Sequence, residues 1–102
     1  KKRTLDLTEC KTSFSQIRGL MFRKIKNDGL LFTFEQEQEV DLHMFFVCYK
    51  IDIIYLNAEK KIIKIKRKVK PFTPYIKSPK AKYILEIKSA EHIQEGEQVT
   101  FL

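Results

Sequence analysis

The chain contains few of the residues that mark specialised classes of protein. Its 102 residues include 2 Cys, 3 Gly, 3 Pro and no Trp. Two cysteines cannot form a disulfide-dense scaffold, and so little Gly and Pro excludes a fibrous or linker-like sequence. No apolar run approaches the length of a membrane-spanning helix. Because 43% of the residues are hydrophobic, a disordered chain is excluded as well, and we expect one globular domain over residues 1–102.

Positive charge is in excess and is concentrated in one segment. The chain has 20 Lys and Arg against 13 Asp and Glu, a formal net charge of +7. Segments 1–34 and 60–82 carry +5 and +10, whereas segments 35–59 and 83–102 carry −5 and −3. Because the basic segment contains no acidic residue, we expect a strongly dipolar molecule.

Lysines alternate with mostly aliphatic residues inside this basic segment. In an extended strand one face would present Lys64, Lys66, Lys68 and Lys70. Such a row predicts a phosphate-binding surface, with nucleic acid as partner, whose affinity falls as salt rises. The alternative is a half-buried strand whose solvent face happens to be lysine, which discourages edge-to-edge aggregation. The segment contains no recognised nucleic-acid-binding motif.

Hydrophobic periodicity predicts short strands throughout the chain. Alternating or continuous apolar runs favour strands near residues 4–8, 30–34, 42–47, 51–56, 61–69, 83–87 and 99–102. We expect residues 57–60 to form a hairpin turn and residues 35–41 to form an acidic surface loop. The sequence therefore predicts a mainly β protein, a small single-domain β-barrel or sandwich-like fold.

Capping residues predict one or two short helices within this β fold. Ser13 followed by Gln16 resembles a capping box and predicts a helix over residues 13–22. Ser89 could cap a single helical turn over residues 90–95. Gly96 would then occupy the left-handed position that ends this turn.

Asp52 is the strongest candidate for a buried charge, because it lies in the apolar run 51–56. A buried carboxylate needs a partner or a proton. Arg18 and Arg23 are candidate partners, since a guanidinium can bind a carboxylate through two hydrogen bonds. Such a pair could line a pocket or fix a helix on the sheet. A small enzyme of unknown reaction that acts through Asp52 is a further alternative.

The segment 71–75 combines prolines and aromatic residues and predicts an ordered loop that could form one wall of a binding site. Together with the end of the helix and the His43 segment, it predicts a ligand pocket. Its candidate lining residues are Arg18, Met21, His43, Met44, Asp52, Phe72 and Tyr75. The alternative is that Phe72 and Tyr75 simply cover one end of the fold.

Histidine, methionine and cysteine offer soft metal ligands, but their spacing is not that of a standard metal site. His43 and Cys48 lie in one apolar run, where methionine usually serves as core filler. His92 has no serine or cysteine partner in a recognisable catalytic arrangement. We therefore expect no metal, no cofactor and no catalytic residue. The function predicted first is a non-enzymatic binding or accessory domain.

Compartment and oligomeric state are weakly specified by the sequence. No apolar signal core is present, so we expect a cytoplasmic monomer, and a processed export signal stays the alternative. Without a cysteine framework, Cys10 and Cys48 are expected to be free thiols, with one disulfide as the alternative in an exported protein.

Several short motifs follow one another along nearly the whole chain. They are Arg-Gly-Leu-Met-Phe-Arg at 18–23, Gly-Leu-Leu-Phe-Thr-Phe at 29–34, His-Met-Phe-Phe-Val at 43–47, Ile-Asp-Ile-Ile-Tyr-Leu at 51–56, Lys-Pro-Phe at 70–72, Ala-Lys-Tyr-Ile-Leu-Glu-Ile at 81–87 and Gly96. Their order and spacing resemble the domain-of-unknown-function family 192 (DUF192). The His-Met-Phe-Phe form is similar to that of archaeal members.

The resemblance implies a compact, mainly β domain with no established activity. The chain departs from the family pattern at Gly96-Glu97, where members typically have Gly-Asp. It departs again at Ser89-Ala90, where many have a glycine. Both places are predicted turns, so the implied fold is unaffected. The lysine-rich strand itself lies outside the shared motifs.

Overall fold

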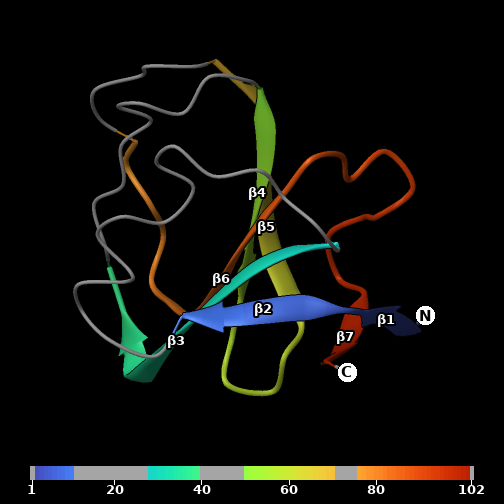
Figure 1. Cartoon of the computed structure of the whole chain (residues 1–102). Coiled ribbons are helices and arrows are strands. Elements are labelled where there is room, and N and C mark those ends of the chain that lie inside the picture. The colour runs from blue at the N-terminus through green and yellow to red at the C-terminus, as the bar shows by residue number, and fades with distance from the viewer. Residues whose placement is uncertain (1, 11–27, 40–49, 71–75, 102) are drawn as a thin grey trace.

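The computed structural model of the chain describes residues 2–10, 28–39, 50–70 and 76–101. Within these residues the backbone forms strands and no helix (Figure 1). The strands are β1 (Lys2–Leu5), β2 (Leu7–Cys10), β3 (Gly29–Gln38), β4 (Ile51–Leu56), β5 (Ile62–Val69), β6 (Ala81–Ile87) and β7 (Gln98–Phe101). The mainly β prediction is therefore confirmed. The predicted helix 13–22, strand 42–47 and loop 71–75 lie outside the described residues.

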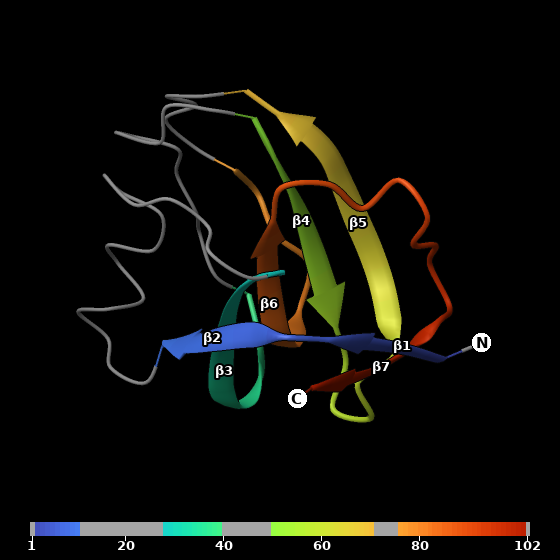
Figure 2. The same cartoon turned by 45° about the vertical axis from the view of Figure 1, so that its right-hand side comes forward.

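The strands form two sheets that share the N-terminal segment of the chain. One sheet has the order β2-β3-β6-β4-β5, and β1 and β7 form the other. β2 and β1 pair in parallel with β3 and β7, whereas β3, β6, β4 and β5 pair antiparallel. The single strand expected near residues 4–8 is thus divided at Asp6 between the two sheets (Figure 2). Within the described residues the sheets do not close into a barrel.

Apolar residues cover both faces of the five-stranded sheet, and β4 is buried along its whole length. One cluster, here called the Tyr55 face, contains Leu30, Phe32, Ile51, Ile53, Tyr55, Ile76, Ala81 and Ile84. The other, the Leu85 face, contains Leu7, Leu31, Ile54, Leu56, Ile62, Leu85, Ile87, Ala90, Ile93 and Val99. Because successive strand residues point to opposite faces, a strand buried on both sides is apolar at nearly every position.

The acidic segment is strand rather than loop over much of its length. β3 continues to Gln38 and reaches β6 again where Gln38 pairs with Ala81, after a register shift that begins at Thr33. The prediction of a loop over residues 35–41 is therefore wrong as far as Gln38. The reason is that backbone pairing with β6 overrides the low strand propensity of Glu and Gln.

The segment after β6 forms turns where a helical turn was predicted. Residues 90–95 contain two turns and no helix. The Ile93 N–H donates to the Ala90 carbonyl, and Ser89 Oγ accepts weakly from the Glu91 N–H at 3.4 Å. The expected left-handed glycine is confirmed, because Gly96 has φ of 91°. The segment forms turns rather than a helical turn because it folds back onto the Leu85 face, where Ala90 and Ile93 are buried.

A bulge in β5 and the end of the strand break the predicted row of four lysines. Lys64 and Lys66 pair with Tyr55 and Ile53 of β4 and so share the Tyr55 face. The next residue on that face is Val69, which pairs with Ile51. Two residues of β5 therefore stand opposite one residue of β4, as in a β-bulge. Lys68, inside this bulge, has φ of 52° and leaves the row. Lys70 follows the end of the strand.

Among the residues that the structure describes, no helix has the length and apolar character needed to cross a membrane.

The predicted hairpin turn over 57–60 is confirmed, and Asn57 organises it. Asn57 Oδ1 accepts from the backbone N–H groups of Glu59 and Lys61 at 3.0 and 2.9 Å. Lys60 ends the turn with φ of 63°, in the left-handed region.

Candidate functional site

Of the residues predicted to line the ligand pocket, the structure describes one. Asp52 lies in β4, whereas the other candidates fall outside the described residues: Arg18, Met21, His43, Met44, Phe72 and Tyr75. The candidate partner Arg23 also falls outside them. The pocket therefore stays a prediction, and the described residues show what Asp52 does.

Asp52 is buried, with 6% of its surface exposed, and both carboxylate oxygens accept backbone hydrogen bonds. Oδ1 accepts from the Lys68 N–H at 2.7 Å, and Oδ2 accepts from the Ala90 N–H at 2.6 Å. The first bond braces the bulge in β5, where Lys68 has a positive φ. The second ties the segment after β6 to the sheet. Short hydrogen bonds to a carboxylate are strong. Because both oxygens of Asp52 are engaged in such bonds to the backbone, they favour the structural interpretation of Asp52 over a catalytic one.

Arg67, which lies in the same bulge as Lys68, also holds the segment after β6. Its Nη1 and Nη2 donate to the carbonyl oxygens of Ala90 and Ile93, both at 2.6 Å. Arg3 adds a third anchor, because it pairs with Glu97 at 2.9 Å and donates to the His92 carbonyl. Two of the basic side chains thus hold the fold together.

Lysines gather along the outer part of the Tyr55 face. Lys66 Nζ donates to the Lys77 carbonyl, which brings the Lys77 segment beside β5. Partial burial and the nearby ammonium groups of Lys64 and Lys77 lower the pKa of Lys66. β5 is the last strand of its sheet among the described residues. Like charges that crowd one another at a sheet edge favour the binding of an anion, which would relieve their repulsion.

A basic hollow lies where β7 meets the turn between β4 and β5. Its volume is about 580 Å³, and its lining residues are Lys2, Lys60, Lys61, Gly96, Gln98, Val99 and Thr100. The lining contains three lysines and no acidic side chain. Lys61 pairs with Gln98 in an isolated bridge, and the Val99 N–H donates to the Lys60 carbonyl at 2.9 Å. Backbone pairing of β7 with the turn therefore positions these side chains.

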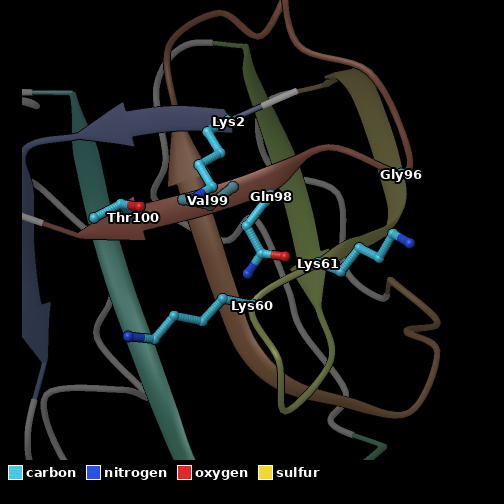
Figure 3. Close-up of a pocket in the computed structure, with 7 residues that line it drawn as sticks. All are labelled: Lys2, Lys60, Lys61, Gly96, Gln98, Val99 and Thr100. Carbon is cyan, nitrogen blue, oxygen red and sulfur yellow. The ribbon is translucent and has the colours of Figure 1, made fainter.

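The lysine side chains of the basic hollow do not converge on one point. Figure 3 shows Lys60 and Lys61 directed away from one another, with the Gln98 amide between them. Lys2 comes from β1, on the opposite side of β7 from the turn (Figure 3). Ammonium groups spread in this way suit several separate negative charges better than one small anion.

Two aromatic rings lie next to the basic hollow. Tyr83 of β6 and Phe101 of β7 have ring centroids 5.3 Å apart and planes at 71°, an edge-to-face pair. The Lys60 ammonium lies 4.7 Å from the centroid of Phe101 and 5.9 Å from that of Tyr83. These distances are those of cation–π contacts. Both rings are half-buried.

A second hollow provides an electrostatic contrast. It has a volume of about 630 Å³ and is lined by Gln36, Glu37, Gln38, Glu39 and Lys80. Lys80 is therefore a lysine in acidic surroundings, unlike those of the basic hollow. Among the described residues, no group of three His, Cys, Asp or Glu side chains could hold a metal ion.

Sequence reasoning missed a buried polar group on the Tyr55 face. Glu86 pairs with Leu30 on one side and Ile53 on the other, so it lies in the middle of the five-stranded sheet. Burial raises the pKa of its carboxyl from 4.5 to about 7. Tyr55 lies on the same face, and its hydroxyl is 2.9 Å from Ser78 Oγ. Burial also raises the pKa of Tyr55 to about 12.

The sequence of β6 contains a signal that could have identified Glu86 as buried, namely aliphatic residues on both faces of the strand. Ile84 and Glu86 share one face of β6, and Leu85 and Ile87 share the other. A strand with aliphatic residues on both faces is buried on both faces, so a carboxylate between them is buried as well. The basic hollow had no such signal, because β1, the hairpin turn and β7 are far apart in the sequence.

The fold and surface define a small mainly β domain with a basic hollow at the junction of its two sheets. The chain belongs to the DUF192 family, described as "Uncharacterized ACR, COG1430", whose model matches residues 1–101. A UPF0127 protein from Thermococcus sibiricus is 35% identical over 77 residues, which cover 74% of this chain and 49% of that relative. The expected resemblance, in its archaeal form, is confirmed. The chain spans about half the length of this curated relative.

Solved structures share the fold. A protein of unknown function from Novosphingobium aromaticivorans superimposes with a TM-score of 0.75 at 24% identity, covering 92% of this chain and 71% of that one. A protein from Sinorhizobium meliloti, described as a proposed transcription regulator, gives a TM-score of 0.75 at 21% identity, covering 88% and 74%. At these identities the likeness concerns the fold alone.

Proposed function

We propose that this chain is a non-enzymatic binding domain whose ligand is an extended polyanion. The observation that carries the proposal is the basic hollow, which is lined by three lysines and no acidic side chain. The excess of positive charge in the whole chain would add long-range attraction. A cluster of like charges on a concave surface raises the local concentration of anions and their rate of association.

The arrangement of the lysines favours an extended ligand over a small one. Lys60 and Lys61 point in different directions (Figure 3), so a single phosphate would contact one of them at a time. A chain of phosphates or carboxylates would place separate charges near each lysine. The lysines of the Tyr55 face, Lys64, Lys66 and Lys77, offer a further basic area for the same class of ligand.

A small-ligand pocket is the second candidate. The sequence places it among Arg18, Met21, His43, Met44, Phe72 and Tyr75. Asp52 belongs to this set as well, but its carboxylate binds two backbone N–H groups. Exchange of His43 for Ala, followed by a thermal-shift screen against a small-molecule library, tests this candidate. Shifts that appear with the parent and vanish with the variant would support it, and their absence would count against it.

The polyanion proposal is tested by titration with polyphosphate and with single-stranded and duplex oligonucleotides at several salt concentrations. The decisive variant is the double exchange Lys2→Gln and Lys61→Gln. Each lysine that contacts a phosphate contributes about 0.7–0.9 to the slope of log affinity against log salt. We therefore expect the double variant to bind more weakly and to reduce the slope by about 1.5.

The matched control is the double exchange Lys80→Gln and Lys88→Gln, which removes the same charge elsewhere. Lys80 lines the acidic hollow, and Lys88 is exposed beyond β6. We expect the control to retain most of the affinity. Equal losses in both double variants would show that net charge alone drives binding and would refute the basic hollow as the site. Absence of salt-sensitive binding at micromolar protein would refute the proposal as a whole.

A further inference from the structure

We infer that the basic hollow and the adjacent Tyr83–Phe101 pair together bind single-stranded nucleic acid, with phosphates on the lysines and a base on the aromatic rings. This inference rests on the proposed polyanion function and narrows its ligand to one chemical class. Polyphosphates and acidic polysaccharides provide charge without an aromatic face. A nucleic-acid strand provides both, in alternation along one chain.

The aromatic pair and the lysines lie within reach of one another. Lys60 lines the basic hollow, and its ammonium is 4.7 Å from the Phe101 centroid and 5.9 Å from the Tyr83 centroid. The hollow and the two rings therefore meet at this one side chain. Val99 of the hollow and Phe101 lie two residues apart in β7, so their side chains share one face of the strand. A ligand that crosses the hollow along β7 would reach the rings next.

The rings are positioned by the sheets rather than by flexible loops. Tyr83 lies in β6 and pairs with Leu56 and Thr33, and Phe101 lies in β7 and pairs with Leu5. Both side chains pack against the Leu85 face yet remain half-buried, so part of each ring is accessible. A preformed aromatic surface that needs no reordering is the kind of platform on which bases stack.

Lys60 would change partner when a base binds. Its ammonium now lies over the rings, where cation–π attraction holds it at modest strength. A base that stacks on Phe101 would displace the ammonium, whose flexible stem can redirect it to the adjacent phosphate. The exchange replaces one favourable contact by two, stacking and a charge-assisted hydrogen bond.

A single strand fits these features better than a duplex. In a duplex the bases are stacked on one another, and only their edges face a bound protein. A ring platform next to a basic hollow can contact a base face only when the strand is unpaired. Stacking tolerates every base, so the structure predicts little dependence on sequence.

The test measures, by fluorescence anisotropy, the binding of a labelled single strand. Its length is about 12 nucleotides, which is within the site size of small β domains. Polyphosphate serves as the base-free polyanion. The variants are Tyr83→Leu and Phe101→Leu, and the control is Phe34→Leu, a partly buried aromatic on the other face of the sheet. We expect each aromatic variant to weaken single-strand binding roughly tenfold and to leave polyphosphate binding unchanged.

A second measurement covers the case in which a leucine variant folds poorly. The chain has 4 Tyr and no Trp, so its intrinsic fluorescence comes from tyrosine. Stacking of a base on Tyr83 would quench part of this emission. The variant Tyr83→Phe keeps a ring and the packing, so it should bind the single strand with parental affinity and show weaker quenching.

The outcomes separate this inference from the proposed function. If the Lys2 and Lys61 double variant loses affinity for both ligands while the aromatic variants lose nothing, the polyanion function stands and the single-strand inference falls. Quenching in Tyr83→Phe equal to that in the parent, or tighter binding of duplex than of single strand, would also overturn it. If neither ligand binds in a salt-dependent manner, the proposed function falls as well.

Discussion

Glu86 makes the stability of the protein depend on pH in a direction that can be calculated from the structure. Its carboxyl is buried in the middle of the sheet, with 7% of its surface exposed, and burial raises its pKa from 4.5 to about 7. The folded state therefore holds a proton more tightly than the unfolded state. An increase of about 2.5 in pKa corresponds to ~3 kcal/mol, because one pKa unit is about 1.4 kcal/mol.

The sign follows from which state binds the proton. Below about pH 4.5 the carboxyl is protonated in both states and costs no stability. Between about pH 4.5 and 7 the unfolded state releases its proton while the folded state keeps it, so stability falls as pH rises. Above about pH 7 the folded protein holds a buried charge, and the full cost of about 3 kcal/mol is present.

The perturbation is Glu86→Gln, which keeps the shape of the side chain and removes its titration. We expect the variant to match the parent near pH 4.5 and to exceed its free energy of unfolding by up to about 3 kcal/mol at pH 8. Guanidinium denaturation at intervals from pH 4.5 to 8 measures both proteins. The exposed Glu91, exchanged in the same way, serves as the control and should follow the parent.

The result that would refute the reasoning is a constant difference between Glu86→Gln and the parent at every pH. It would mean that the carboxyl titrates alike in the folded and unfolded states and that burial does not control its charge. A variant that becomes less stable than the parent as pH rises would reverse the predicted sign. It would show that the folded state stabilises the ionised carboxylate.

The remaining predictions concern the contacts that shape the Leu85 face and the sheet centre. Asp52→Asn should lower the free energy of unfolding by about 2 kcal/mol, because the new amide turns an N–H toward a backbone N–H; unchanged stability in guanidinium denaturation would return Asp52 to the candidate site. Gly29→Ala should lower the free energy of unfolding by about 2 kcal/mol or more, since the new methyl would collide with the backbone carbonyl oxygen of Glu86 and with Cγ2 of Ile87; a melting temperature equal to that of the parent would disprove the close contact. Arg67→Met should speed amide hydrogen exchange at Ile93 about tenfold, because two hydrogen bonds from a charged donor to that segment are lost; exchange at the parental rate would show that the arginine does not hold this segment.

The sequence predicted the main features that depend on neighbours along the chain. Alternation and β-branched residues predicted β4, β5 and β6, and Asn57 marked the hairpin turn that joins the first two of these strands. The glycine at position 96 indicated the left-handed turn that the structure contains. These features are local, because they follow from side-chain periodicity and from the φ values that a residue type tolerates.

Features that depend on pairing between distant strands could not be predicted from the periodicity of side chains along the chain. The sequence suggested four lysines on one face of β5, but register with β4 creates a bulge that removes Lys68 from the row. It suggested an acidic loop where pairing with β6 extends β3 to Gln38. Strand register is decided by which backbone groups meet across the sheet, and a shift of one residue reverses the face of every side chain that follows.

The amino-acid sequence by itself determined the charge, the apolar strands and the family of this protein. Tertiary structure alone decided that Asp52 would brace a bulge and that Glu86 would be enclosed by β3 and β4. It also decided that Lys2, Lys60 and Gln98 would surround one hollow. The physical reason is that burial and charge proximity depend on distances in space. Residues from opposite ends of the chain become neighbours only when the backbone pairs β1 with β7 and β7 with the hairpin turn.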